Sequence, residues 1–243
     1  MTDQQLLALM YDFYNKYTLR DQNKDIDYYI NQFNKYSANN ILVVGAGTGR
    51  VVIPLSNYAR TTALDFDLER LKLLRKKCNT AFIICSDFLD IDNLSYYDLI
   101  IFPYSTIQFG GDTSKMYEIF NKLGRLMNNN STCLFDISES FNNKPEKIEE
   151  FLFKNYCDDI SSNVEVYYSS KKYKEYIEFL VRYKIFESNR EVIENEKYCY
   201  YDRSLLNYSL NDNGLLISKI DDGYGSKILQ HKHIYHCRRK NER

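Results

Sequence analysis

A glycine-rich turn directly after an apolar run constrains the fold of this chain more than any other feature. Residues 41–50 read ILVVGAGTGR, so a β-branched run is followed by glycines at positions 45, 47 and 49. Glycine accepts positive φ and lets the backbone lie against a ligand, toward which the N–H groups of a following helix also point. The dinucleotide fingerprint G-x-G-x-x-G would need a glycine where this chain has Arg50. The turn therefore predicts a nucleotide-binding loop and disfavours NAD.

Polar residues follow the next strands that the sequence predicts. These strands are 61–65 with Asp65, 81–85 with Asp87 close behind, and 97–103 with Ser105 close behind. In an open parallel sheet, ligands bind at the carboxyl ends of strands, so we expect these side chains to share one crevice. Asp65 lies 20 positions after Gly45, where a carboxylate can accept both hydroxyls of a ribose. A helix N-cap or loop position is the alternative for each aspartate.

Helices and strands alternate through the first half of the chain. Apolar periodicity predicts helices at 3–18, 50–59, 67–77 and 113–127, with a second helix before the first strand, and strands at 41–45, 61–65, 81–85, 97–103 and 131–137. Such alternation is typical of a parallel sheet with helices on both faces. After Phe141 the pattern changes to antiparallel strands at 164–168, 173–187 and 190–201. This insertion would lie over the crevice; the alternative is that it covers core or forms the edge of a homodimer.

Several motifs together resemble the class I S-adenosylmethionine (SAM)-dependent methyltransferases, in particular their bacterial small-molecule branch. The motifs are GAGTGRVVIPLS, ALDFD, SDFLDI, YDLIIFPYSTIQ, LFDIS, the early KDIDYYINQF, and the tail CYYDRSLLNYSLNDNGLLISKIDDGYG with HIYHCRRK. The resemblance implies an α/β fold with a doubly wound, mostly parallel, seven-stranded Rossmann-like sheet and an antiparallel insertion before the last helix. Its domains would be an N-terminal helical lid at 1–40, a SAM-binding core at 41–141 and 202–243, and an inserted substrate cap at 142–201.

The resemblance also implies a role for each matching residue. The three glycines would wrap the methionyl end of SAM, Asp65 would bind the ribose, and Phe66 would pack on adenine. Asp87 and the backbone of Phe88 would contact the adenine edge, while residues 102–105 would lie beneath the sulfonium. The cofactor-binding residues so implied are Gly45, Ala46, Gly47, Thr48, Gly49, Asp65, Phe66, Asp87, Phe88, Phe102, Tyr104 and Ser105. Val43 departs from the family, which usually has an acid two residues before the first glycine.

Methyl transfer from an activated sulfonium requires mainly positioning and exclusion of water, with a base wherever the acceptor carries a proton. Candidates for that base are Tyr11, Tyr14 and Asp136, followed by Gln108 and Glu139. We therefore expect a SAM-dependent methyltransferase that acts on N or O of a small molecule. One alternative is a SAM-binding protein without turnover, acting as a sensor or scaffold. An NAD-dependent oxidoreductase is a weaker alternative.

Composition narrows the partners and the compartment. The net charge is −1, from 32 basic and 33 acidic residues, so no overall positive field would attract nucleic acid. No apolar run reaches the roughly 18 residues that span a membrane, and a cytoplasmic protein is expected. The six scattered cysteines suit reduced core positions. His231 and His233 could share a strand face, but no third ligand stands near them, so we expect no metal site.

Overall fold

The computed structural model describes residues 1–18, 23–92, 94, 96–110, 112, 114–143, 145–200 and 202–240. Thr113 and Tyr201, which bound the expected fifth helix and the expected insertion, lie outside the described residues. Among the residues that are described, no helix combines the length and the apolar content that crossing a membrane requires.

A seven-stranded sheet organises the core, in the strand order β10-β11-β5-β4-β1-β2-β3. Its strands are β1 (Asn40–Val44), β2 (Arg60–Asp65), β3 (Phe82–Cys85), β4 (Leu99–Phe102), β5 (Thr132–Ser138), β10 (Leu215–Asp222) and β11 (Lys232–Arg239). The strands β1 to β5 pair in parallel, whereas β11 runs antiparallel to both β5 and β10. The sheet is therefore mostly parallel, which confirms the fold class predicted from the sequence. The chain order reverses at β1 and β4, so the glycine loop follows a strand at the switch point.

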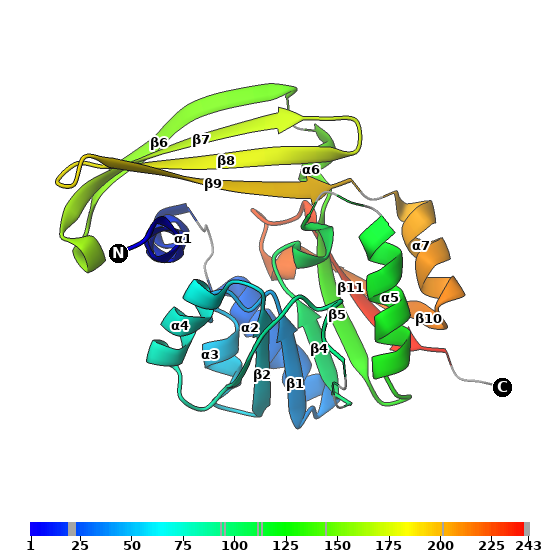
Figure 1. Ribbon diagram of the computed structural model, residues 1–243. Helices are drawn as coiled ribbons and strands as arrows, with labels where there is room; N and C mark the ends of the chain where they lie inside the picture. Colours follow the sequence, from blue (N-terminus) through cyan, green and yellow to red (C-terminus); the bar gives the residue numbers. More distant parts are fainter. Residues whose placement is uncertain are drawn as a thin grey trace.

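Helices cover both faces of this sheet (Figure 1). On one face lie α2 (Lys24–Tyr36), α3 (Val52–Leu55) and α4 (Leu68–Lys77), and on the other lie α5 (Ser114–Leu126) and α7 (Arg203–Asp212). Each face buries its own apolar cluster, one around Tyr29 and Leu74, the other around Phe120 and Leu210. Burial on both faces explains why the central strands read as continuous apolar runs.

The helix after the glycine loop is much shorter than the expected 50–59. Only Val52–Leu55 is helical, and the N–H groups of Tyr58 and Ala59 turn back to the carbonyl of Leu55 before β2 begins. Residues 51–53 are β-branched and so poor helix formers, and Pro54 is accommodated only because it lies in a first turn. The expected boundaries were wrong here because one turn suffices to reach the neighbouring strand.

A second sheet of four antiparallel strands follows β5 and the short helix α6 (Ser140–Asn143). It is a meander of β6 (Lys147–Cys157), β7 (Ser162–Lys172), β8 (Tyr176–Ile185) and β9 (Arg190–Cys199). The sequence predicts three of these strands and misses β6. That strand is a largely exposed edge with a register shift between Phe151 and Phe153, so it lacks the regular alternation of a half-buried strand.

The first helix, α1 (Asp3–Thr18), lies beneath the four-stranded sheet and next to the end of the core that carries the glycine loop (Figure 1). Its buried residues Leu6, Met10 and Phe13 form a third apolar cluster with residues of β7, β8 and β9, among them Tyr183. The insertion and α1 therefore share one core, and together they cover the loop end of the seven-stranded sheet.

Candidate functional site

The glycine loop has a backbone that other residues would adopt only with strain. Gly45, Gly47 and Gly49 have φ values of 71°, 53° and 99°. A Cβ at position 49 would lie 2.3 Å from a methyl carbon of Leu74, and one at position 45 would lie 2.6 Å from Thr106. The first and third glycines are thus required by close packing as well as by conformation.

Asp65 joins the end of β2 to this loop. Its carboxylate accepts the Gly47 N–H at 2.7 Å and the Asp67 N–H at 2.9 Å. Burial raises the pKa of Asp65, and the two backbone hydrogen bonds oppose that rise. Because each carboxylate oxygen has a second lone pair, Asp65 can hold the loop and still accept from a ligand hydroxyl.

Helix α1 closes over the loop through the ring of Tyr11 and the carboxylate of Asp12. The ring of Tyr11 lies 3.6 Å from the position that a Gly47 Cβ would take, and the guanidinium of Arg70 stacks on its face at 4.1 Å. Asp12 accepts the Thr48 hydroxyl at 2.5 Å and also pairs with Lys77. The sequence predicts Tyr11 at this site but gives no sign of Asp12 or Arg70, which look like ordinary surface charges on two helices.

A partly buried ion pair lies beside the loop, and the sequence does not indicate which residue pairs with Arg50. Arg50, the residue that rules out the dinucleotide fingerprint, contacts both oxygens of Asp25 at 2.9 and 2.5 Å. Its guanidinium also lies 5.3 Å from the ring centre of Tyr104. Val43 is fully buried in the apolar cluster on the α2 face of the sheet. Helix α2 therefore supplies a carboxylate that pairs with Arg50 of the loop, which sequence spacing could not show.

Tyr104 and Ser105 form a strained turn at the end of β4. Their φ values are 59° and 62°, in the left-handed region that is costly for residues with a Cβ. The Ser105 N–H and hydroxyl donate to one oxygen of Asp136, at 2.9 and 3.2 Å, and hold the turn in place. The turn places the Tyr104 ring near two cations, since the Arg50 guanidinium lies 5.3 Å and the Lys232 Nζ atom 4.1 Å from its centre. Burial raises the pKa of Tyr104.

Asp136 itself is completely buried and forms an ion pair with Lys232 at 3.0 Å. Lys232 begins β11, a strand far along the chain, so no local spacing could connect the two residues. Asp136 lies at the carboxyl end of the sheet, as predicted, but its charge is already matched by the lysine. Its observed contacts are those of a residue that holds the β4 turn.

The residues expected at adenine lie at different depths. Phe66 is 60% exposed, and its ring lies 5.9 Å from that of Phe109, which in turn contacts Tyr198 of β9. Asp87 is exposed and accepts the Leu89 N–H at 2.9 Å. The side chains of Phe88 and Phe102 are buried and pack edge to face at 5.2 Å, so they shape the core beneath the crevice.

The other candidate bases differ in their surroundings. Tyr14 is partly buried below the four-stranded sheet, where burial raises its pKa. Gln108 accepts the Ser138 N–H at 2.8 Å and donates to the Cys199 carbonyl at 3.1 Å, so it ties β5 to the end of β9. Glu139 pairs with His233 at 3.1 Å near the surface. The hydrogen bonds of Gln108 thus have a structural role, and Glu139 forms an exposed ion pair.

The histidines near the end of the chain have structural partners. His236 is fully buried and bonds the hydroxyls of Tyr28 at 2.7 Å and Tyr36 at 2.6 Å, as well as Asp221 at 2.9 Å. These bonds fasten α2 to β11. In the part of the chain that the structure describes, no three metal-binding side chains come together.

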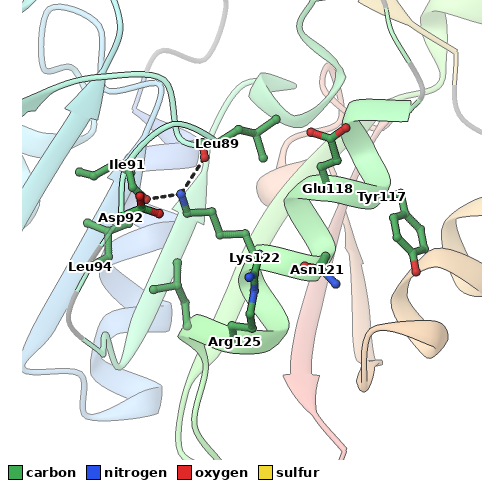
Figure 2. A pocket seen from close by; sticks show the side chains of 10 residues that line it. Leu89, Ile91, Asp92, Leu94, Tyr117, Glu118, Asn121, Lys122 and Arg125 are labelled. Carbon is green, nitrogen blue, oxygen red and sulfur yellow. Dashed lines mark hydrogen bonds between the residues drawn. The ribbon is translucent and has the colours of Figure 1, made fainter.

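A separate cleft lies between α5 and the segment that follows β3 (Figure 2). Lys122 points into it, donates to the Leu89 carbonyl at 3.0 Å and also donates to the Ile91 carbonyl. Figure 2 shows these two hydrogen bonds at the centre of the lining residues. The lining includes none of the residues expected to bind a cofactor. The ammonium group of Lys122 already donates to two backbone carbonyls, so we assign the cleft no role.

Comparison with solved structures identifies the fold. The chain is similar to a SAM-dependent methyltransferase from Clostridium acetobutylicum, with a TM-score of 0.80, 16% identity and coverage of 96% of this chain and 98% of that chain. It is also similar to an amino pentose methyltransferase from Micromonospora echinaspora, solved with SAM bound, at TM-score 0.76 and 12% identity, covering 95% of this chain and 97% of that chain. A sugar N-methyltransferase from a Streptoalloteichus species gives TM-score 0.76 and 12% identity, covering 95% of this chain and 93% of that chain.

These likenesses span nearly the whole chain, including the four-stranded insertion, and they establish that the protein has the fold of SAM-dependent methyltransferases. No family model and no curated protein matches the sequence.

Proposed function

We propose that this protein is a SAM-dependent methyltransferase that transfers a methyl group to N or O of a small molecule. The observation that carries the proposal is the Asp65 carboxylate bound to Gly47, at the switch point of a sheet with this strand order. The likeness to an amino pentose methyltransferase and to a sugar N-methyltransferase supports a small-molecule acceptor. The antiparallel strand β11 and the Arg50–Asp25 pair disfavour the alternative of a dinucleotide-dependent oxidoreductase.

The residues around the loop fit SAM. Asp65 would bind the ribose hydroxyls, and the exposed ring of Phe66 would cover adenine. The Asp25–Arg50 pair offers one carboxylate and one guanidinium beside the loop, which complements the ammonium and carboxylate of a methionyl group. When bound, SAM supplies an electrophilic methyl carbon. The chain's own contribution would be to orient the acceptor beside Tyr104 and to exclude water with α1 and the insertion.

Ligand binding and turnover test this proposal separately. Calorimetric titration should show binding of SAM and S-adenosylhomocysteine (SAH), and no binding of NAD. Release of SAH should then be measured by mass spectrometry with panels of small amines and alcohols as acceptors. A protein that binds SAM yet releases no SAH above the buffer background with any acceptor would support the sensor or scaffold alternative. Binding of NAD in place of SAM would refute the proposal.

We further propose that residues 1–40 include a lid, formed by α1, and that residues 142–201 form a substrate cap over the core at 41–141 and 202–243. The support for a lid is the contact of Tyr11 with the loop and the hydrogen bond from Thr48 to Asp12. Since Leu6, Met10 and Phe13 belong to the core shared with the insertion, a point substitution tests the lid better than removal of the helix.

Asp12→Ala is expected to loosen this lid. It removes the acceptor of the Thr48 hydroxyl and of the Lys77 ammonium, and bonds of this kind contribute roughly 0.5–1.5 kcal/mol each. SAH should therefore dissociate about threefold to tenfold faster in stopped-flow measurements. Asp3→Ala is the matched control, because Asp3 pairs with Arg190 at the exposed start of the same helix. Equal dissociation rates for wild type and Asp12→Ala would show that α1 does not gate the site.

A further inference from the structure

The face of the four-stranded sheet that looks toward the glycine loop carries an unusual pair of acids. Successive residues of a strand point to opposite faces, so Glu194, Glu196 and Tyr198 of β9 share one face. All three are partly buried, whereas residues 191, 193, 195 and 197 on the other face are exposed. Glu194 forms an ion pair with Arg70 of α4, which orients this face toward the crevice. Acids on an inward-facing strand surface call for a counter-charge.

Arg70 interacts with several carboxylates at once. This guanidinium pairs with Glu194 and with Asp67, and it also acts electrostatically on Glu196 and Asp65. The hydrogen bond described for Glu196 comes from the Tyr198 hydroxyl at 2.9 Å, a neutral donor. Among the described residues, Arg70 is thus shared by four carboxylates. Burial raises the pKa of Glu196, and the attraction of Arg70 opposes that rise without cancelling it.

Four tyrosine hydroxyls lie within electrostatic reach of Glu196, two of them on α1. Its charge acts on the hydroxyls of Tyr11 and Tyr14 of α1, Tyr183 of β8 and Tyr198. The Tyr11 ring covers Gly47, so this cluster is continuous with the proposed SAM site. A carboxylate that lies beside other acids recognises an organic ammonium, because the opposite charges form charge-assisted hydrogen bonds. An uncharged hydroxyl compound would gain much less.

We propose that the methyl acceptor is an amine, and that Glu196 binds its ammonium group and accepts its proton. This inference rests on the proposed methyltransferase function and narrows it from N or O to nitrogen. It also assigns a catalytic residue to the insertion, in addition to the candidates Tyr11, Tyr14 and Asp136. Asp136 is less suited to hold a cationic acceptor, because its charge is matched by Lys232.

The proton and the electrons balance as follows. The acceptor ammonium gives one proton to the Glu196 carboxylate and becomes a neutral amine with a free lone pair. The amine nitrogen then bonds to the methyl carbon of SAM, and the electron pair of the broken carbon–sulfur bond goes to sulfur, which leaves SAH. The product is a methylated ammonium. After product release, the Glu196 carboxylic acid returns its proton to water.

The test compares a cation with a neutral compound of the same shape. The probes are cyclohexylamine and cyclohexanol, titrated by calorimetry into protein saturated with SAH. Wild type should bind cyclohexylamine at least tenfold more tightly than cyclohexanol. Glu196→Gln preserves shape and should reduce this preference to threefold or less. Glu191→Gln, on the exposed face of the same strand, should keep the wild-type preference.

The pH profile distinguishes a binding role from a merely structural one. As pH falls through the raised pKa of Glu196, the carboxylate is protonated and the amine preference of wild type should fade; in Glu196→Gln it should not change over that interval. The charged and titratable groups facing Glu196 are Arg70, Glu194, Tyr11, Tyr14, Tyr183 and Tyr198. Glu194 is the other carboxylate among these groups, so Glu194→Gln is measured as well and should retain a pH-dependent preference.

Two results would overturn this inference: equal affinity of wild type for both probes, or a full amine preference in Glu196→Gln. The SAH titration of the same samples separates this failure from failure of the proposed function. SAH affinity should agree within threefold among all variants, which also shows that each variant is folded. A wild type that binds no SAH would refute the methyltransferase proposal itself.

Discussion

Replacing Asp136 by asparagine is expected to destabilise the protein by about 3–5 kcal/mol, the usual cost of removing one partner of a buried ion pair. Lys232 is 8% exposed and would be left as an uncompensated charge beside the ring of Tyr104. The substitution also weakens the two hydrogen bonds that hold the Ser105 turn. Urea unfolding followed by circular dichroism measures the effect.

The double variant Asp136→Asn/Lys232→Met serves as the control for this prediction. It removes both charges, and because neutral replacements of buried pairs are often tolerated, much of the lost stability should return. A single Asp136→Asn variant within about 1 kcal/mol of wild type would mean that the pair is well solvated, contrary to its burial.

Asp65→Ala is expected to weaken SAH binding by about tenfold or more, since each charge-assisted hydrogen bond to the ribose is worth roughly 1.5–3 kcal/mol. The structure adds a second reason for a large effect. The same carboxylate accepts the Gly47 N–H, so its loss also frees the loop that would surround the ligand. Calorimetric titration with SAH gives the affinities directly.

Asp202→Ala provides a matched comparison for Asp65→Ala. Asp202 also accepts two backbone N–H groups, from Ser204 and Leu205, but it caps α7 at a distance from the glycine loop. Its loss should lower stability slightly and leave SAH affinity unchanged. Equal SAH affinities for Asp65→Ala and wild type would remove Asp65 from the binding site.

Much of the core could be predicted because its signals are local. The apolar runs of β1, β4 and β5 are buried on both faces, and a run of that kind has few other stable arrangements. The glycines at 45 and 49 indicate a tight turn, and a side chain at either position would clash with a neighbouring residue. The exposed edge strand β6 was missed for the opposite reason, since neither face of it is regularly apolar.

The candidate site could be predicted only in part, for the same physical reason. Asp65 and the glycines lie within one βαβ unit, so their spacing alone brings them together, as the hydrogen bond between Asp65 and Gly47 shows. Arg50 was recognised in the sequence only as a missing glycine, because its partner Asp25 lies on a separate helix. The sequence does not indicate Glu196 as a site residue. An acid on a polar strand resembles a solvated residue unless the elements that pack against that strand are known.

The sequence by itself determined the parallel core and the position of the loop at its switch point, because periodicity and turn chemistry act over a few residues. Only the tertiary structure decided how charge is distributed around that loop. Lys232 meets Asp136, Arg70 meets Glu194, and α1 closes over Gly47 through contacts between segments that are far apart in the chain. Such contacts depend on how whole sheets and helices pack, and burial then makes each charge strongly dependent on its partner.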